Sequence, residues 1–305
     1  MDLHSNLQSY GLKPLNFNAD ETSQAGGINR REFMMTSLAI GFALASNPIM
    51  AQAINTDDNG LIAGEVSVPV ADGNMPAYRA MPKKGKNLPV ILVVQEIFGV
   101  HEHIKDVCRR FAKMGYLAIA PELFGRQGDV SKMTDIGEIL SKVVSKVPDE
   151  QVFSDLDATV AYVKTTGKAN MNKLATVGFC WGGRTVWLYA AHNPNIKTGV
   201  AYYGLLNGMK SDIKANDPVD IGINIKAPIL GLYASQDSFI KPEVIEQMQG
   251  ELEKSGSGSE IVVFPNVSHG FYADYRPTYN KTAADYSWQL TRDWLKRHGV
   301  KLIYN

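Results

Sequence analysis

Short apolar runs alternate with amphipathic segments along most of this chain. Continuous apolar runs, typical of strands covered on both faces of a sheet, fall at residues 90–94, 116–120, 174–178, 199–203, 228–233 and 260–264. Apolar residues recur at helical spacing within residues 102–114, 136–147, 152–163, 244–252 and 283–296. The alternation predicts an α/β fold with a mostly parallel central sheet and helices on both of its faces.

Residues 64–70 and 76–81 alternate apolar and polar positions instead, which predicts an antiparallel pair at one edge of the sheet. The chain has 305 residues, of which 45% are hydrophobic, so it can bury one full core. We therefore expect a single α/β domain at residues 56–305, preceded by a different kind of segment at residues 1–55.

The first segment carries the elements of an export signal in the usual order. Paired arginines at residues 30–31 precede Phe33, a small-residue apolar stretch follows at 37–45, and residues 51–53 read Ala-Gln-Ala. The pattern resembles a bacterial twin-arginine signal that is removed after Ala53. We therefore expect transient contact with that export machinery and a periplasmic or secreted protein. An ordinary amphipathic N-terminal helix is the alternative, and an uncleaved signal would act as an anchor.

Charge and composition narrow the classes of partner. The formal net charge is zero and no basic cluster is present, which argues against nucleic acid. No apolar run reaches the roughly 18 residues of a confident membrane span. Phosphate-binding glycine loops are absent, so no cofactor is implied. His101 and His103 offer only two nitrogens without a third ligand nearby, so we expect no metal.

The candidate chemistry centres on Cys180, which follows a predicted strand in the sequence Gly-Phe-Cys-Trp-Gly-Gly at residues 178–183. Glycines two positions before and after a nucleophile allow a strained strand-to-helix turn, because a Cβ there would strike neighbouring backbone. The start of the next helix favours a thiolate and can hold an oxyanion. The motif predicts covalent catalysis, although a buried cysteine in tight helix-on-sheet packing would also fit it.

Two later residues complete a possible catalytic set. Asp237 follows the apolar run at 228–233, and His269 follows the run at 260–264. Hydrolases with this turn present nucleophile, acid and histidine in that chain order, each after a strand. The other cysteine, Cys108, lies on the core-facing stripe of a predicted helix, where we expect it to be buried and inert.

Six segments in order resemble the dienelactone hydrolase family, the cysteine branch of the α/β-hydrolases. The likeness covers roughly residues 60 to 300 and rests on residues 95–100, 121–127, 178–183, 202–204, 236–237 and 268–271. It implies the α/β-hydrolase fold, with Cys180 as the nucleophile, His269 as the base and Asp237 as the carboxylate that orients it.

The resemblance assigns further roles around these three residues. It implies that Glu96 contacts the resting thiol and helps to remove its proton, and that the N–H groups of Ile97 and Trp181 form the oxyanion hole. Independently, a carboxylate beside a thiol discourages its ionisation by like-charge repulsion. Tyr202 and Tyr203, the last two residues of the 199–203 run, either face the site or fill the sheet.

In this family two arginines hold a carboxylate of the substrate. Arg126 matches the first of them. The second position, four residues after His269, is Ala273 here, and Arg276 is the nearest candidate to replace it. The sequence thus predicts a hydrolase of an ester or lactone, similar to carboxymethylenebutenolidase, with a small-molecule substrate. Other esterase, thioesterase or peptidase chemistry on the same triad, or a non-catalytic binding protein on this scaffold, are the alternatives.

Overall fold

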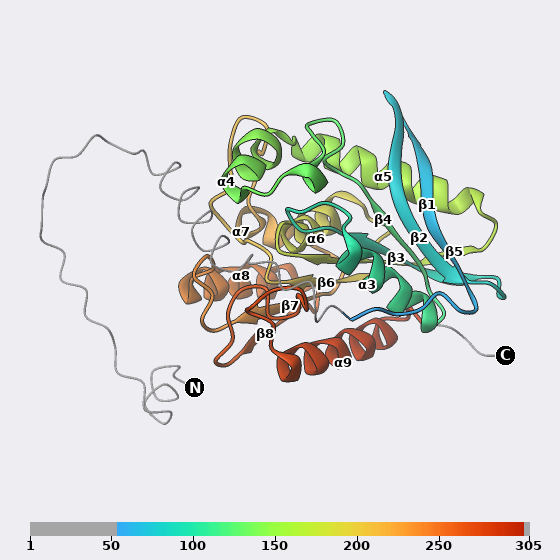
Figure 1. The fold of residues 1–305 in the computed structure, drawn as a ribbon. Helices are drawn as coiled ribbons and strands as arrows, with labels where there is room; N and C mark the ends of the chain where they lie inside the picture. Colours follow the sequence, from blue (N-terminus) through green and yellow to red (C-terminus); the bar gives the residue numbers. More distant parts are fainter. Residues whose placement is uncertain (1–53, 302–305) are drawn as a thin grey trace, which may run out of the picture. The chain divides into compact units, whose positions relative to one another are not determined.

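The structure is a computed structural model that describes residues 54–301, so the export signal predicted at residues 1–55 falls almost entirely outside the described residues. Within them, eight strands form one sheet in the order β1-β2-β4-β3-β5-β6-β7-β8 (Figure 1). Their bounds are β1 Leu61–Val70, β2 Gly73–Pro82, β3 Leu88–Val94, β4 Leu117–Pro121, β5 Ala169–Phe179, β6 Thr198–Tyr202, β7 Ile229–Ala234 and β8 Glu260–Phe264.

Every strand that the apolar pattern predicts is present. Strands β3 to β8 pair in parallel, with Val177 of β5 opposite Val93 of β3 and Val200 of β6. β1 and β2 are antiparallel and form the predicted edge. The residues of β3, β4, β6 and β7 are all buried, as continuous apolar runs require. The sheet is the mostly parallel one of the predicted α/β-hydrolase fold.

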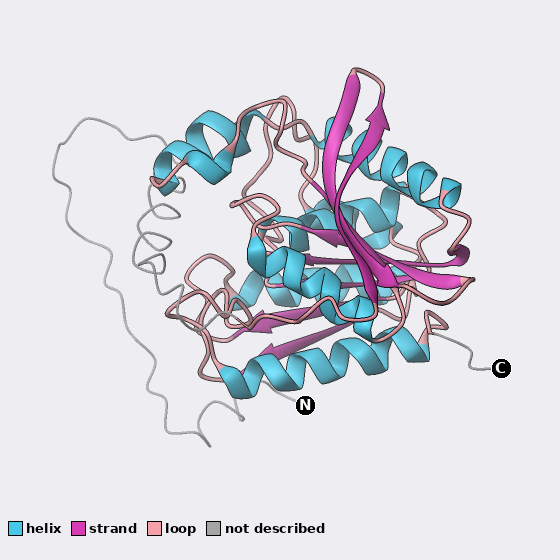
Figure 2. Ribbon diagram, turned by 45° about the vertical axis from the view of Figure 1, so that its right-hand side comes forward, coloured by secondary structure: helices cyan, strands magenta, loops and turns pink. Residues whose placement is uncertain are grey.

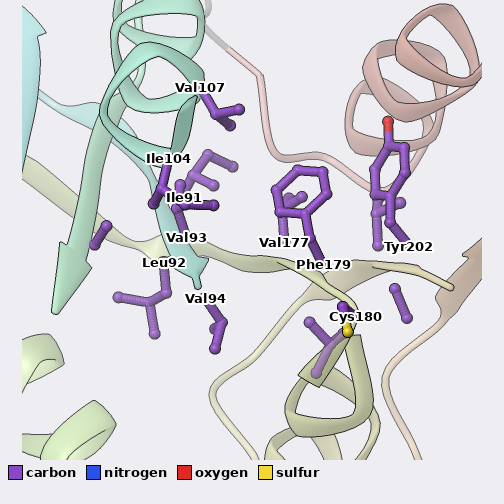
Figure 3. Close-up of a cluster of buried hydrophobic side chains, with 14 of the residues drawn as sticks. Ile91, Leu92, Val93, Val94, Ile104, Val107, Val177, Phe179, Cys180 and Tyr202 are labelled. Carbon is purple, nitrogen blue, oxygen red and sulfur yellow. The ribbon is translucent and has the colours of Figure 1, made fainter. Parts of the chain in front are cut away.

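Helices cover both faces of the sheet (Figure 2). The longer ones are α3 Glu102–Lys113, α5 Asp149–Thr165, α6 Trp181–His192, α8 Pro242–Ser255 and α9 Lys281–Arg297. In Figure 3, Ile91 and Val93 point toward α3, whereas Leu92 and Val94 point to the opposite face. This is the two-residue period of a strand that is buried on both sides. Among the described residues, no helix combines the length and apolar character needed to cross a membrane.

Two segments differ from the prediction. Residues 136–147 were expected to form one helix, but they form three short pieces, α4 Ile136–Glu138, a π-helical turn at Ile139–Val143 and a 3-10 turn at Val144–Lys146. β8 was expected to be covered on both faces, but it lies at the outer edge of the sheet, and Val263 is 42% exposed. Between β6 and β7 lie only the short helix α7 Pro218–Ile221 and a 3-10 turn at Gly222–Asn224.

The residues just before β1 form a strap across α3. Arg109 Nε donates to Thr56 O across 2.7 Å, and Lys113 Nζ lies 2.6 Å from an Asp57 carboxylate oxygen. At the start of the strap, the Ile54 N–H donates to Asp274 Oδ2 at 3.1 Å. The strap therefore joins the first described residue to the loop that follows β8.

The parallel strands bring five polar side chains to one edge of the sheet. Glu96 follows β3, Cys180 follows β5, Tyr203 follows β6, Asp237 follows β7 and His269 follows β8. Because these strands are neighbours that run in the same direction, their carboxyl ends lie side by side, where α/β sheets collect their ligand sites.

Candidate active site

Cys180 occupies the junction of β5 and α6 in a backbone conformation that side chains rarely adopt. Its φ is +54° and its ψ is −113°, and the residue is 3% exposed. Its N–H donates to Tyr202 O at 3.0 Å, and its carbonyl accepts the Arg184 N–H at 3.2 Å. Figure 3 shows the sulfur at the point where the strand turns into the helix. Strain held in this way by surrounding contacts is characteristic of functional turns.

The glycines of the turn are required by close backbone contacts. A Cβ on Gly178 would lie 2.2 Å from the carbonyl oxygen of Gly182, and one on Gly182 would lie 2.4 Å from that of Val94. A Cβ on Gly183 would lie 2.5 Å from the Tyr202 carbonyl oxygen. The structure thus confirms the steric reason for the glycine spacing around Cys180.

Asp237 and His269 lie together beside this turn. His269 Nδ1 donates to Asp237 Oδ2 across 2.8 Å, and the Asp237 side chain has no exposed surface. Asp237 Oδ1 accepts the N–H groups of Phe239 at 2.9 Å and Ile240 at 3.3 Å. The carboxylate is therefore fixed by its own turn and orients the imidazole. The structure places His269 and Asp237 side by side, each after the strand that the chain order suggested.

The electrostatics favour a proton on His269. Burial opposes a charge on the imidazole, but Asp237 and Cys180 favour the imidazolium more strongly and raise the pKa of His269 to about 10. The Cys180 side chain contributes to this effect through its interaction with the imidazole. A histidine that keeps its proton beside a thiol favours a thiolate–imidazolium pair.

Glu96 is completely buried and holds several partners at once. Tyr275 Oη donates to Glu96 Oε2, and Arg276 Nη2 lies 3.2 Å from Glu96 Oε1. His101 Nε2 is 3.7 Å from Oε2. Burial by itself would raise the pKa of Glu96, but Arg276 and His101 reverse this and hold it far below its ordinary value. Glu96 is therefore a carboxylate, and the contact with the thiol that the resemblance implies stays a prediction.

Arg276 is buried in the same network. Its Nε donates to Tyr275 Oη at 3.1 Å, and its guanidinium lies 5.1 Å from the centre of the Phe98 ring. Cys180 and Tyr203 contribute to the electrostatic environment of this guanidinium. Arg276 thus reaches the site from a position three residues beyond Ala273, which stands where the family has its second arginine, but it meets a carboxylate of the protein itself.

Arg126 lies elsewhere, at the β1–β2 hairpin. Its Nε and Nη2 donate to Asp72 at 2.6 and 2.7 Å, and its Nη1 and Nη2 donate to Asp155 at 2.6 and 3.0 Å. The structure therefore gives Arg126 two carboxylate partners from the protein. Substrate binding by Arg126 stays a prediction, and it would require the guanidinium to exchange at least one of these partners.

The oxyanion hole expected from the N–H groups of Ile97 and Trp181 stays a prediction. Ile97 directly follows Glu96 after β3, and Trp181 is the first residue of α6, whose opening N–H groups have no partner within the helix. Both residues are nearly inaccessible, at 3% and 2% exposed. The Trp181 ring packs against Phe124, with 4.8 Å between ring centres.

The structure separates the roles of the two adjacent tyrosines. Tyr202 fills the core, and its hydroxyl lies 2.6 Å from Thr291 Oγ1 and donates to Ser287 O at 3.2 Å, both in α9. Tyr203 has a φ of +38°, and the centre of its ring lies 5.0 Å from that of His269 rather than against α9. Glu96 and Cys180 help to raise the pKa of its buried hydroxyl well above the ordinary value, after burial itself. Tyr203 therefore faces the site.

Tyr275 and His101 were not among the predicted site residues. Both contact Glu96, and their rings lie 4.7 Å apart. The only signal for Tyr275 in the sequence is its position beside Arg276. His103 instead contacts Asp274, with 2.8 Å between Nδ1 and Oδ1. Within residues 54–301, no group of three histidine, cysteine or acidic side chains is arranged to hold a metal ion.

Cys108 is wholly buried in α3, as predicted. Burial raises the pKa of its thiol far above the ordinary range. Both cysteines are free thiols in the structure. Of the two, only Cys180 has a histidine partner.

Comparisons with known proteins identify the family of this chain. Residues 75–299 match the model of the dienelactone hydrolase family. The chain belongs to this family. It is therefore a hydrolase that acts on ester or lactone bonds.

The similar proteins extend over nearly the whole chain. A protein of Methylorubrum extorquens named "Putative carboxymethylenebutenolidase" is 55% identical over 93% of this chain and 99% of its own length. A protein of Escherichia coli K12 with the same name is 48% identical over 88% of this chain and 99% of its own length.

Solved structures support the fold. The crystal structure of a "Putative Dienelactone Hydrolase" from Klebsiella pneumoniae has a TM-score of 0.76 and 49% identity, and covers 78% of this chain and 99% of that one. Acylaminoacyl peptidase from Pyrococcus horikoshii has a TM-score of 0.62 at 16% identity, over 82% of this chain and 45% of that one. At that identity the likeness concerns the fold alone.

Proposed function

We propose that this chain hydrolyses an ester or lactone through Cys180, His269 and Asp237. The observation that supports the proposal is the hydrogen bond between Asp237 and His269, two residues that follow neighbouring parallel strands, together with the interaction of His269 with Cys180. Asp237 holds the imidazole by a 2.8 Å hydrogen bond, and the imidazole interacts with the Cys180 side chain. Nucleophile, base and orienting carboxylate are the parts that covalent acyl transfer requires.

The proposed reaction has two halves. The Cys180 thiolate attacks the carbonyl carbon, and the carbonyl oxygen becomes an oxyanion that accepts hydrogen bonds from the N–H groups of Ile97 and Trp181. The oxyanion collapses, the carbon–oxygen bond of the ester breaks, and the imidazolium of His269 gives its proton to the departing alkoxide. His269 then takes a proton from water, which attacks the thioester and releases the acid together with the thiolate.

Glu96 acts in this scheme through the groups that it holds. It fixes Tyr275 and Arg276 at the site, and it would have to leave both of them to accept the thiol proton. The imidazole of His269, which interacts with the Cys180 side chain, takes the role of proton acceptor in this scheme. We therefore propose that Glu96 positions Tyr275 and Arg276, and that it could contact the thiol only after it has released both of them.

The relatives support a lactone or ester as the small-molecule substrate, because two of them carry the name carboxymethylenebutenolidase. For the whole protein we propose export through the twin-arginine route and action in the periplasm or outside the cell, on the strength of the motif at residues 30–53.

The decisive experiment replaces the nucleophile. Cys180→Ala should lower the hydrolysis of p-nitrophenyl esters by about a thousandfold or more, because the covalent route is lost. Cys108→Ala is the matched control and should retain activity, since that thiol is buried away from any histidine partner. Mass spectrometry of the protein after a short reaction should find the acyl group on Cys180. Full hydrolysis by the Cys180→Ala protein would refute the proposal.

A non-catalytic binding protein would give a different result in the same experiment. It would bind the ester without releasing p-nitrophenolate, and Cys180 would remain unacylated. Thioesterase or peptidase chemistry would retain the dependence on Cys180 but would show higher rates on thioesters or peptides than on matched oxygen esters.

A further inference from the structure

Glu122 directly follows β4 and lies against the loop that carries Ile97. We infer that this carboxylate is a positioning residue, which holds in place the two N–H groups that the proposed mechanism assigns to the oxyanion, those of Ile97 and Trp181. The inference rests on the proposed function and adds the group that supports its oxyanion hole.

Ile97 lies in a tight turn after β3. An isolated antiparallel bridge joins Glu96 to Gly99, so Ile97 and Phe98 are the two central residues of the turn. Gly99 has a φ of +73°, a conformation that residues with a side chain rarely adopt. The turn is therefore a compact unit, and the direction of the Ile97 N–H depends on where the whole unit is held.

Glu122 fixes the end of this unit. Its Oε2 accepts the N–H of Val100, the residue after the turn, at 2.8 Å. A Cβ on Gly99 would lie 2.8 Å from the same oxygen, so the carboxylate packs directly against the turn. The backbone of Glu122 is held in its turn, because its N–H donates to Pro76 O in β2 at 2.8 Å. The turn is thus anchored to the sheet.

The same carboxylate supports the second half of the oxyanion hole through Phe124. The Phe124 N–H donates to Glu122 Oε1 at 3.5 Å. The ring of Phe124 packs against that of Trp181, with 4.8 Å between ring centres. Gln95 joins the two loops once more, since its Oε1 accepts the Leu123 N–H at 3.3 Å. Glu122 therefore contacts a support of each residue whose N–H would receive the oxyanion.

The position of Glu122 is unfavourable for a carboxylate. Burial raises its pKa above the ordinary value, and the N–H groups of Val100 and Phe124 offset only part of this effect. Asp129 raises the pKa further by like-charge repulsion. Removing a carboxylate from water costs several kcal/mol. Its presence at this position is consistent with a role in function, for which proteins give up stability.

The test separates attack on a carbonyl from reactivity of the thiol. Acylation of Cys180 by p-nitrophenyl acetate forms an oxyanion, whereas alkylation by iodoacetamide displaces iodide from a saturated carbon and forms none. Glu122→Met retains a side chain of similar length and removes both acceptor oxygens. We expect kcat/KM for the ester to fall by about a hundredfold, as for a misplaced oxyanion donor, and the alkylation rate of Cys180 to stay within about threefold.

Three further variants complete the comparison. Glu122→Gln retains one acceptor oxygen for the Val100 N–H, so its ester activity should stay within about tenfold of wild type. Glu122→Asp withdraws the carboxylate by one methylene and should show the selective loss of ester activity, which keeps the test decisive in the event that Glu122→Met does not fold. Glu260→Met is the matched control, because Glu260 is an exposed residue at the start of β8, paired with Arg297 and opposite the end of the sheet that carries the site.

Three results would overturn the inference. They are an ester rate that neither Glu122→Met nor Glu122→Asp lowers, ester and alkylation rates that fall together in the folded variants, and a Glu122→Gln protein no more active than Glu122→Met. The outcome is separable from that of the proposed function, because Cys180→Ala tests the covalent route without any change at Glu122. A protein that requires Cys180 but not Glu122 retains the mechanism and loses only this support.

Discussion

Tyr203 places a hydroxyl at the site that the fold itself does not use. Its ring lies against His269, it is completely buried, and its oxygen has no hydrogen-bond partner among residues 54–301. A buried polar group without a partner costs stability, so its retention at this position is consistent with a bond to the substrate.

Replacing Tyr203 by Phe should therefore separate activity from stability. We expect kcat/KM for a model ester to fall by about tenfold while the melting temperature stays the same or rises, because no internal hydrogen bond is lost. Tyr202→Phe is the opposite control. Because the Tyr202 hydroxyl bonds to α9, the Tyr202→Phe variant should lose about 1 kcal/mol of unfolding free energy with little change in kinetics. Kinetic constants and denaturant curves of both variants check the pair, and a Tyr203→Phe protein with normal kinetics would exclude Tyr203 from substrate binding.

Asp237 should set the alkaline limit of activity through its effect on His269. The raised pKa of His269, about 10, means that the imidazolium is retained until the pH approaches that value. Above it the proton is lost, and with it the charge that stabilises the thiolate. In Asp237→Asn the largest favourable partner of the imidazolium is removed, so its pKa falls and the alkaline limb of the pH–rate profile should move to lower pH. An unshifted limb would show that another group titrates there.

At the scale of elements, the turn between β5 and α6 is the least tolerant part of the fold. A Cβ added to Gly182 would lie 2.4 Å from the carbonyl oxygen of Val94 in the neighbouring strand. Backbone atoms cannot move aside without shifting β3, so Gly182→Ala should cost more than about 2 kcal/mol of unfolding free energy and disturb Cys180.

Gly250 provides the control for that substitution. It lies inside α8, and nothing is within 4 Å of its potential Cβ. Gly250→Ala should therefore stabilise the protein by about 0.5–1 kcal/mol through helix propensity and reduced backbone freedom in the unfolded chain. Urea unfolding of both variants gives the comparison. Equal effects at the two glycines would show that the turn is looser than its contacts imply.

The strands were predictable because burial on both faces leaves a continuous apolar run, as in β3 and β7. The periodicity of residues 136–147 also placed the correct side chains in the core, since Ile136, Leu140 and Val144 are buried. It could not show that the helix is broken. Ser141 Oγ donates to Gly137 O at 2.6 Å and Ser145 Oγ to Ser141 O at 2.8 Å, and such bonds bend helices and compete with their regular pattern.

At the scale of the whole molecule, the position of the site could be predicted from the sequence, but the contacts between its charged residues could not. Cys180, Asp237 and His269 could be proposed from chain order, because each follows a recognisable strand. The partners of the charged residues could not. Arg276 meets Glu96 across 180 positions of sequence, and Arg126 meets Asp72 across 54. No local pattern encodes such pairs, since they depend on how β1, β2 and the loop after β8 are placed by the sheet.

The strap before β1 predicts a second effect of cleavage after Ala53. The Ile54 N–H lies 3.1 Å from Asp274 Oδ2, in the same loop as His269, Tyr275 and Arg276. Cutting the chain after Ala53 would turn this amide into a terminal ammonium, and the hydrogen bond into an ion pair with a buried carboxylate. We expect a protein that begins at Ile54 to melt at a higher temperature near neutral pH than one that begins at Ala53.

That difference should vanish as the pH rises above the pKa of the new amino group, ordinarily about 8 and raised by the carboxylate. Identical melting curves for the two proteins at every pH would rule out the effect. If the difference is observed, removal of the signal also stabilises the active-site loop, because the new N-terminus at Ile54 forms an ion pair that exists only in the processed protein.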